Sequence, residues 1–292
     1  MIVRVPASSA NLGSGFDCLG LAWNLYNEIE FQPADSLLIN GCDERFTGPD
    51  NLAYRGFCAV YESLERPVPP VRISFLKSDI PVSRGLGSSA ALIAAGASAA
   101  DRMGGFGLSR GELLTICTRV EGHPDNLAPA LFGGFTAAAM ENGRAFCVQY
   151  PLSRSLRFLT AVPDTELSTA LARSVMPDGC SRTDAVFNLS RTALLIRGLE
   201  SADMELIRVG LQDRLHQPFR LPLISGAEEF FSLVEEIGGS CAAACISGAG
   251  STLLVITDSD HTLSELEDRL IPRFPSWTIS RQPPDINGAA IV

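Results

Sequence analysis

Glycines and serines cluster between residues 81 and 91, and this segment carries the strongest chemical signal in the sequence. It reads Pro81-Val82-Ser83-Arg84-Gly85-Leu86-Gly87-Ser88-Ser89-Ala90-Ala91, between a predicted strand and a predicted helix of small residues. Glycines let the backbone approach an anion, and a helix start offers unpaired N–H groups and the positive end of its dipole. A helix start that merely packs closely is the alternative. The candidate nucleotide-binding residues are Pro81, Arg84, Gly85, Leu86, Gly87, Ser88, Ser89 and Ala90.

A second cluster, Glu121-Gly122-His123-Pro124-Asp125-Asn126, places two acids, an imidazole and an amide within six residues. Carboxylate and hydroxyl oxygens are hard ligands, so Glu121 could hold Mg²⁺ together with Ser89, or with Ser88 as the less favoured alternative. Asn126 or Asp125 would then orient an acceptor hydroxyl. Asp125 is only a candidate general base, since phosphoryl transfer depends mainly on positioning and charge stabilisation. A helix start capped by Asp125 is the structural alternative.

Lysine is nearly absent from this chain of 292 residues: of 23 basic residues, only Lys77 is a lysine. The segment at 81–91 is therefore not a Walker A loop, because no Gly-Lys-Ser/Thr follows it. Lys77 lies on a predicted strand and is most simply a solvated charge. The net charge of −10 and the absence of a basic run predict no nucleic acid partner.

The sequence also predicts where the protein works. Residues 1–6 show no basic region followed by a long apolar stretch, so we expect no secretory signal. The longest run of small apolar residues, 90–100, is far shorter than the roughly 20 residues that span a bilayer. Eight cysteines without a C-x-x-C pair fit buried thiols in a reducing compartment. We expect a cytoplasmic protein without a membrane partner.

Strands and helices that alternate along the chain must position these groups. A capping box at Ser109 and Glu112 predicts one helix start, and Asn142-Gly143 predicts a hairpin. This pattern favours an α+β fold with two domains, at 1–155 and 156–292. Strands are expected at 2–5, 24–31, 71–77, 135–140, 144–150, 156–162, 241–246, 252–257 and 277–280, and helices at 51–64, 109–119, 181–199, 225–236 and 263–270.

Three glycine-containing blocks, at 5–17, 81–91 and 247–252, resemble in this order the three signature motifs of the GHMP kinase superfamily. The blocks at 6–20, 121–134 and 216–220 are most similar to the homoserine kinase family. The resemblance implies a domain like the second domain of ribosomal protein S5, followed by a ferredoxin-like domain. It also implies ATP and Mg²⁺ as cofactors, and transfer of the γ-phosphoryl group to the side-chain hydroxyl of L-homoserine. The product would be O-phospho-L-homoserine, on the route to threonine.

The same resemblance assigns the acceptor site. Arg173 and Arg220 would hold the α-carboxylate through bidentate forks, although either alone would be read as a surface arginine. Asp17 would pair with the ammonium group. The implied substrate-binding residues are Asn11, Asp17, His123, Thr169, Arg173 and Arg220; the catalytic ones are Asn126, Asp125 and Glu121; the metal ligands are Ser89 and Glu121.

Some alternatives stay open. Mevalonate kinases carry a catalytic lysine in the first motif, where this chain has Ala7-Ser8-Ser9-Ala10, so that activity is disfavoured. Another small hydroxyl substrate, or an inactive binding protein of this fold, remains an alternative. Ser14 and Ser251 stand where the family usually has proline, and we expect both loops to be more flexible for it. The sequence does not fix the oligomeric state, and a homodimer stays open.

Overall fold

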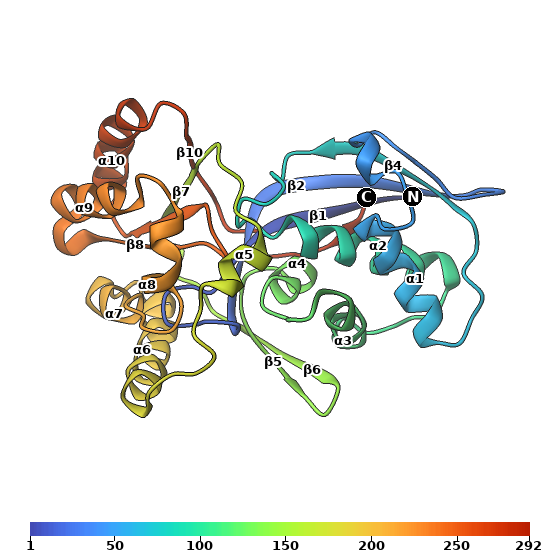
Figure 1. Ribbon diagram of the computed structural model, residues 1–292, viewed down its shortest axis with the longest axis horizontal. Coiled ribbons are helices and arrows are strands. Elements are labelled where there is room, and N and C mark those ends of the chain that lie inside the picture. Colours follow the sequence, from blue (N-terminus) through green and yellow to red (C-terminus); the bar gives the residue numbers. More distant parts are fainter.

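Two β-sheets divide the computed structural model, which describes residues 1–292, into two lobes (Figure 1). The first sheet has seven strands in the order β11-β1-β2-β4-β3, with the β5-β6 hairpin joined to β2. Only the β3 and β4 pair is parallel. The strands are β1 (Ile2–Ala10), β2 (Leu19–Pro33), β3 (Leu38–Asn40), β4 (Val71–Ser78), β5 (Phe135–Glu141), β6 (Arg144–Tyr150) and β11 (Ala290–Ile291).

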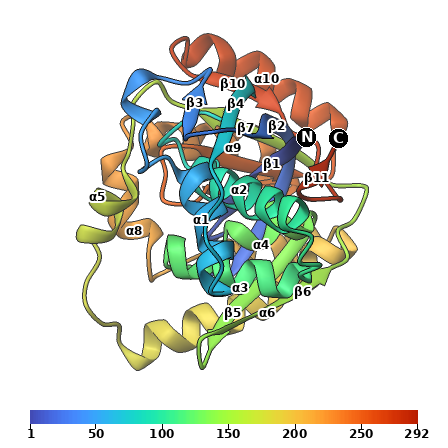
Figure 2. The same ribbon diagram turned by 90° about the vertical axis from the view of Figure 1, so that its right-hand side faces the viewer.

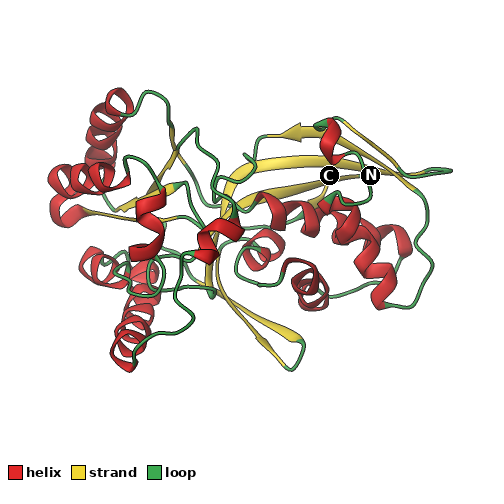
Figure 3. Ribbon diagram, in the orientation of Figure 1, coloured by secondary structure: helices red, strands yellow, loops and turns green.

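Four helices cover one face of the first sheet, as Figures 2 and 3 show. They are α1 (Leu52–Ser63), α2 (Ser88–Gly104), α3 (Arg110–Glu121) and α4 (Leu127–Phe132). Helix α2 consists largely of alanine and glycine, so α1 can pack very close to it. A Cβ on Gly96 would lie 1.8 Å from the carbonyl oxygen of Ala53 in α1. The small residues of α2 therefore let the helix layer lie against β1 beside the cavity described below.

The second sheet has the order β10-β7-β9-β8 and is covered on both faces. Helices α9 and α10 enclose one core with it, whereas α6 and α7 pack on the other face in a core shared with the first lobe. The elements are β7 (Arg157–Val162), β8 (Ala242–Ile246), β9 (Leu253–Thr257), β10 (Thr278–Arg281), α5 (Thr169–Ser174), α6 (Arg182–Ser201), α7 (Met204–Gly210), α8 (Gln217–Arg220), α9 (Ala227–Gly238) and α10 (Asp260–Arg273). Short 3₁₀ helices lie at η1 (Glu44–Phe46), η2 (Leu221–Leu223) and η3 (Gly239–Cys241). The predicted α+β architecture with two domains is confirmed.

The chain crosses between the lobes twice. It leaves the first lobe between β6 and β7 and returns after β10, where β11 pairs with β1 through Val3 and Ile291. Pro284 also forms a bridge with Trp23 of β2. This return differs from the expected arrangement, in which residues 156–292 form one unit. A two-residue strand has too few side chains to show an alternating pattern.

Strand β1 is longer than expected, because residues 6–10 continue it instead of starting a loop. Alanine and serine have weak strand preference, but pairing with β2 overrides it. Ser8 and Ser9 are fully buried, and their hydroxyls bond to Asn126 and Ser247. The end of β1 is therefore a fixed part of the site.

The two serines that replace the usual prolines are buried and hydrogen-bonded, which contradicts the expected flexibility. Ser14 Oγ donates to the carbonyl oxygen of Gly210 at 2.8 Å, and Thr192 Oγ1 donates to Ser14 Oγ at 3.1 Å. Ser251 Oγ donates to the carbonyl oxygen of Thr165 at 2.8 Å. Each hydroxyl fastens its loop to a neighbouring segment, which a proline ring could not do.

Lys77 is half-exposed and pairs with Asp79, as expected of a solvated charge. No helix is both long and apolar enough to cross a bilayer.

Candidate active site

One cavity of about 600 Å³ is lined by residues of both lobes. Its walls come from the glycine loop (residues 81–91), the end of α3, the strap (residues 163–174, which includes α5), and the loop at 247–252. The expected site residues that line it are Asn11, Arg84, Gly85, Gly87, Ser88, Ser89, Glu121, His123, Asn126, Thr169, Arg173 and Arg220. Five others lie outside the lining: Asp17, Pro81, Leu86, Ala90 and Asp125. Leu86 and Ala90 point into the core.

The three glycine-containing blocks meet beside this cavity. Gly248 N–H donates to the carbonyl oxygen of Ala10 at 2.9 Å, and Asn11 Nδ2 donates to the carbonyl oxygen of Gly248 at 2.9 Å. Ser247 Oγ donates to the carbonyl oxygen of Gly85 at 2.6 Å. Segments more than 150 residues apart in sequence are thus joined by hydrogen bonds around the glycine loop.

Gly87 shows why the loop needs glycine. Its φ is 67°, and a Cβ there would lie 2.1 Å from Ser8 Oγ and 2.9 Å from Asn126 Oδ1. Gly87 is also the N-cap of α2 and provides no side-chain cap. The first N–H groups of this 17-residue helix are therefore available to an anion in the cavity.

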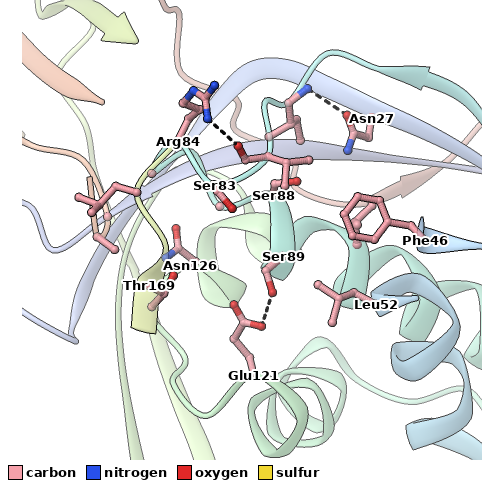
Figure 4. Close-up of a pocket in the computed structure, with 18 of the residues that line it drawn as sticks. Asn27, Phe46, Leu52, Ser83, Arg84, Ser88, Ser89, Glu121, Asn126 and Thr169 are labelled. Atoms are coloured by element: carbon pink, nitrogen blue, oxygen red, sulfur yellow. Dashed lines mark hydrogen bonds between the residues drawn. The ribbon is translucent and has the colours of Figure 1, made fainter. Parts of the chain in front are cut away.

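Ser89 and Glu121 form the oxygen pair next to this helix start. Ser89 Oγ donates to Glu121 Oε2 at 2.6 Å (Figure 4). Glu121 is the last residue of α3, and Gly122 ends that helix in the left-handed conformation. No group of three or more His, Cys, Asp or Glu residues could hold a metal ion alone. A cation here would need further oxygen ligands from a bound nucleotide, and the hard donors present suit Mg²⁺.

His123, which lines the cavity, forms a hydrogen-bonded pair with Asp125, which does not. His123 Nδ1 lies 2.5 Å from Asp125 Oδ1, which also accepts the N–H of Asn126 at 2.9 Å. Asp125 is almost fully buried, and its Oδ2 has no partner. Burial opposes charge on His123, but the hydrogen bond and charge of Asp125, with the charge of Glu121, raise the pKa of His123 above its usual value. The pair presents a readily protonated imidazole to the cavity.

Asn126 is held in place from the other side. Ser8 Oγ donates to its Oδ1 at 3.0 Å and lies 3.2 Å from its carbonyl oxygen. With the side-chain oxygen engaged, the amide nitrogen is the end left for a ligand. In Figure 4, Asn126 and Thr169 lie on one side of Ser89, whereas Phe46 and Leu52 lie on the other.

Two arginines meet at the end of the cavity near Thr169. Arg173 makes a bidentate ion pair with Asp17, with Nη2 to Oδ1 at 2.7 Å and Nη1 to Oδ2 at 3.2 Å. This pairing raises the pKa of Arg173. Arg220 is only 1% exposed and bonds to main-chain carbonyls, at Ala172 (3.2 Å) and Gly248 (3.3 Å). Burial and the charge of Arg173 lower the pKa of Arg220, although a guanidinium stays charged in proteins.

Arg84 lines the cavity, but its guanidinium group reaches the strap. Nη2 donates to the carbonyl oxygen of Asp164 at 2.5 Å, and Nη1 lies 3.5 Å from Glu166. The N–H of Leu167 also donates to the carbonyl oxygen of Ser83 at 3.0 Å. In this structure Arg84 fastens the strap that carries Thr169 and Arg173, a contact that sequence spacing could not reveal.

The apolar end of the cavity carries little signal in the sequence, where only Asn51 and Leu52 are weak candidates for nucleotide contact. Its wall includes Phe46, Leu52, Phe75, Ile80 and Leu92. Asn51 caps α1 and donates from Nδ2 to the carbonyl oxygen of Phe46 at 2.8 Å.

The chain is similar to known proteins along nearly its whole length. Residues 51–134 match the model of the GHMP kinases N terminal domain, and residues 195–275 match that of the GHMP kinases C terminal domain. The chain is 38% identical over 294 residues to a homoserine kinase of Clostridium beijerinckii, covering 99% of this chain and 98% of that one. It is 43% identical over 264 residues to a homoserine kinase of Thermosynechococcus vestitus, covering 88% and 86%. The crystal structure of homoserine kinase from Cytophaga hutchinsonii superposes with a TM-score of 0.89 at 25% identity, over 100% of this chain and 97% of that one.

Proposed function

The chain belongs to the GHMP kinase family, and on that premise we propose that it is a homoserine kinase, which transfers the γ-phosphoryl group of ATP to the side-chain hydroxyl of L-homoserine. The observation that carries the proposal is one cavity whose lining includes both the uncapped start of α2 and two arginines. Substrate and product would be L-homoserine and O-phospho-L-homoserine, on the route to threonine. The free thiols of all eight cysteines support a site of action in the cytoplasm.

The nucleotide would occupy the glycine loop and the apolar end. Its phosphates would accept from the first N–H groups of α2 and from the hydroxyls of Ser88 and Ser89. Its base would lie against Phe46 and Leu52, on the side of the phosphates away from the acceptor. The start of α2 would therefore lie between the nucleotide base and the acceptor, at the point where the phosphoryl group would be transferred.

Ser89 and Glu121 would hold Mg²⁺ on the phosphates. A bound Mg²⁺ would neutralise phosphate charge as the terminal bond breaks. Ser89 and Glu121 fit Mg²⁺ because both offer hard oxygen atoms. The hydrogen bond between them keeps the two oxygens 2.6 Å apart.

The acceptor would bind through charge. Arg220 and Arg173 would hold the carboxylate of homoserine, and Asp17 would pair with its ammonium group. Asn11, His123 and Thr169 line the same end and would fix the orientation of the substrate. Homoserine bound in this way would direct its hydroxyl toward Asn126 and the phosphates.

The transfer would proceed without a strong general base. Asp125 Oδ1 already accepts from His123 and from the N–H of Asn126, and its Oδ2 is sealed from the cavity. We therefore assign Asp125 to the positioning of His123. The amide of Asn126 would orient the acceptor hydroxyl, whose proton can leave late because the transition state of phosphoryl transfer is loose.

Release of ADP in a coupled assay tests the proposal. With ATP and Mg²⁺, homoserine should support far faster turnover than mevalonate, galactose or shikimate at equal concentration. Preference for one of those alcohols would contradict the substrate and leave the kinase activity standing. Measurable ATP binding without ADP release for any acceptor would instead favour an inactive binding protein.

A further inference from the structure

Phe16 lies where several groups that can be positively charged converge. Its ring centroid is 5.2 Å from Arg220 Cζ and 5.9 Å from Arg173 Cζ. The imidazole of His216 stacks on the same ring, with centroids 5.3 Å apart and planes inclined by 22°. Phe16 itself does not line the cavity.

Arg220 lacks the partner that a buried cation normally has. No carboxylate lies within 4.0 Å of its guanidinium, and its hydrogen bonds go to the carbonyl oxygens of Ala172 and Gly248. Buried charges are usually paired, because desolvation is costly. The negative face of an aromatic ring attracts a guanidinium without using up its N–H donors.

Hydrogen bonds hold the support beneath the ring in place. His216 is fully buried, and its Nε2 lies 2.8 Å from the carbonyl oxygen of Gly13, to which it donates. Asp213 accepts the N–H groups of Leu215, His216 and Gln217. Burial lowers the pKa of His216, so this imidazole adds no third charge to the group.

We infer that Phe16 is a positioning residue for the acceptor site, whose ring, resting on His216, holds the guanidinium groups of Arg220 and Arg173 ready for a carboxylate. The ring takes the place of a protein carboxylate beside Arg220. A carboxylate there would compete with the substrate, whereas the ring takes up none of the N–H donors. Nε and Nη1 of Arg220 donate to main-chain carbonyls, so Nη2 is left for the ligand. This role rests on the proposed function, since the ligand in question is the carboxylate of homoserine.

The test compares Phe16→Leu with Phe16→Tyr, which keeps the ring. Phe16→Leu should raise the KM for homoserine about tenfold, the scale of a desolvated cation–π contact. The KM for ATP and kcat should change less than about twofold, and Phe16→Tyr should stay near the wild type. Phe57→Leu is the matched control, because Phe57 is a buried ring that packs on Phe31 and Tyr61 without an arginine.

A double-mutant cycle separates positioning from general loss of packing. In an Arg220→Met background, Phe16→Leu should lower kcat/KM for homoserine far less than in the wild type. An equal effect in both backgrounds, or an unchanged KM in folded Phe16→Leu, would overturn the inference. If Phe16→Leu does not fold, Phe16→Met is measured in the same two backgrounds. A wild type inactive with homoserine would contradict the proposed function, whereas an active wild type with an unaffected Phe16→Leu would contradict this inference alone.

Discussion

Asp17 and Arg173 form a bidentate ion pair that joins the loop after β1 to helix α5, with the shorter contact at 2.7 Å. Both side chains are partly exposed, so the pair is accessible to a ligand. Homoserine carries the same two charges. It can therefore replace the partner of each residue, whereas a ligand with a single charge leaves Asp17 or Arg173 without one.

The acceptor should accordingly need both of its charged groups. We expect 4-hydroxybutanoate, which lacks the ammonium group, and 3-amino-1-propanol, which lacks the carboxylate, to show kcat/KM values lower than that of homoserine by about tenfold to a hundredfold. Steady-state assays with each alcohol measure this. In Asp17→Asn the penalty for the missing ammonium should shrink, and an undiminished penalty would contradict the pairing with Asp17.

Arg220→Met should raise the KM for homoserine by about tenfold or more, because it removes a charge-assisted contact of about 1.5–3 kcal/mol. The KM for ATP should change little, since Arg220 lies at the acceptor end. Arg269→Met is a suitable control, because Arg269 is half-exposed on α10 and pairs only with Glu236. An unchanged KM for homoserine in Arg220→Met would remove this residue from the site.

Ser89→Ala should lower kcat by about a hundredfold or more, through loss of a hydroxyl at the reacting phosphates. Raising the Mg²⁺ concentration should recover part of the loss if Ser89 is a ligand. Ser98→Ala is the matched control on the same helix, where the hydroxyl donates to the carbonyl oxygen of Ala94. Equal activities of the two variants would exclude Ser89 from the chemistry.

Stability should fall as the pH drops below about 6.5, the ordinary pKa of histidine. Because burial lowers the pKa of His216 in the folded state, the unfolded chain binds more protons there below that pH, and the free energy of unfolding decreases. Above it the contribution is fully present. Urea unfolding between about pH 5 and pH 8 measures the slope. His216→Asn should flatten it, whereas His261→Asn, at an exposed position, should not.

His123 should affect the free energy of unfolding above about pH 6.5, whereas His216 affects it below that pH. Its pKa is raised in the folded state, so the stability it contributes is complete below about 6.5 and is lost as the pH rises through the folded value. His123→Asn should therefore flatten the alkaline side of the same unfolding series. A slope unchanged there would show that the pair with Asp125 does not titrate in this range.

Short sequence patterns predict many of the helices and strands of this fold. The capping box at Ser109 and Glu112 starts α3, and Asn142 and Gly143 turn the β5-β6 hairpin, both with positive φ. Features set by distant partners could not be read in the same way. The extension of β1 depends on pairing with β2, and β11 depends on an edge of a sheet built nearly 290 residues earlier.

The candidate site likewise has one part that the sequence reveals and another that only the fold brings together. The glycine loop and the Glu121 cluster stand out because their residue types occur together in sequence. Phe46, Phe75 and Leu92 look like any core residues, and only the fold brings them to one cavity wall. Phe16 and Arg84 act through partners about 80 to 200 residues away, so their spacing carried no signal of those contacts.

The double crossing of the chain between the lobes limits how the enzyme can move. Two covalent connections, one before β7 and one after β10, join the lobes, and α6 and α7 share a core with the first lobe. The lobes are therefore not two bodies joined by a single linker. The strap is fastened to the glycine loop at Arg84 and Ser83, so the segment that carries Thr169 and Arg173 is tied to the segment that would hold the phosphates.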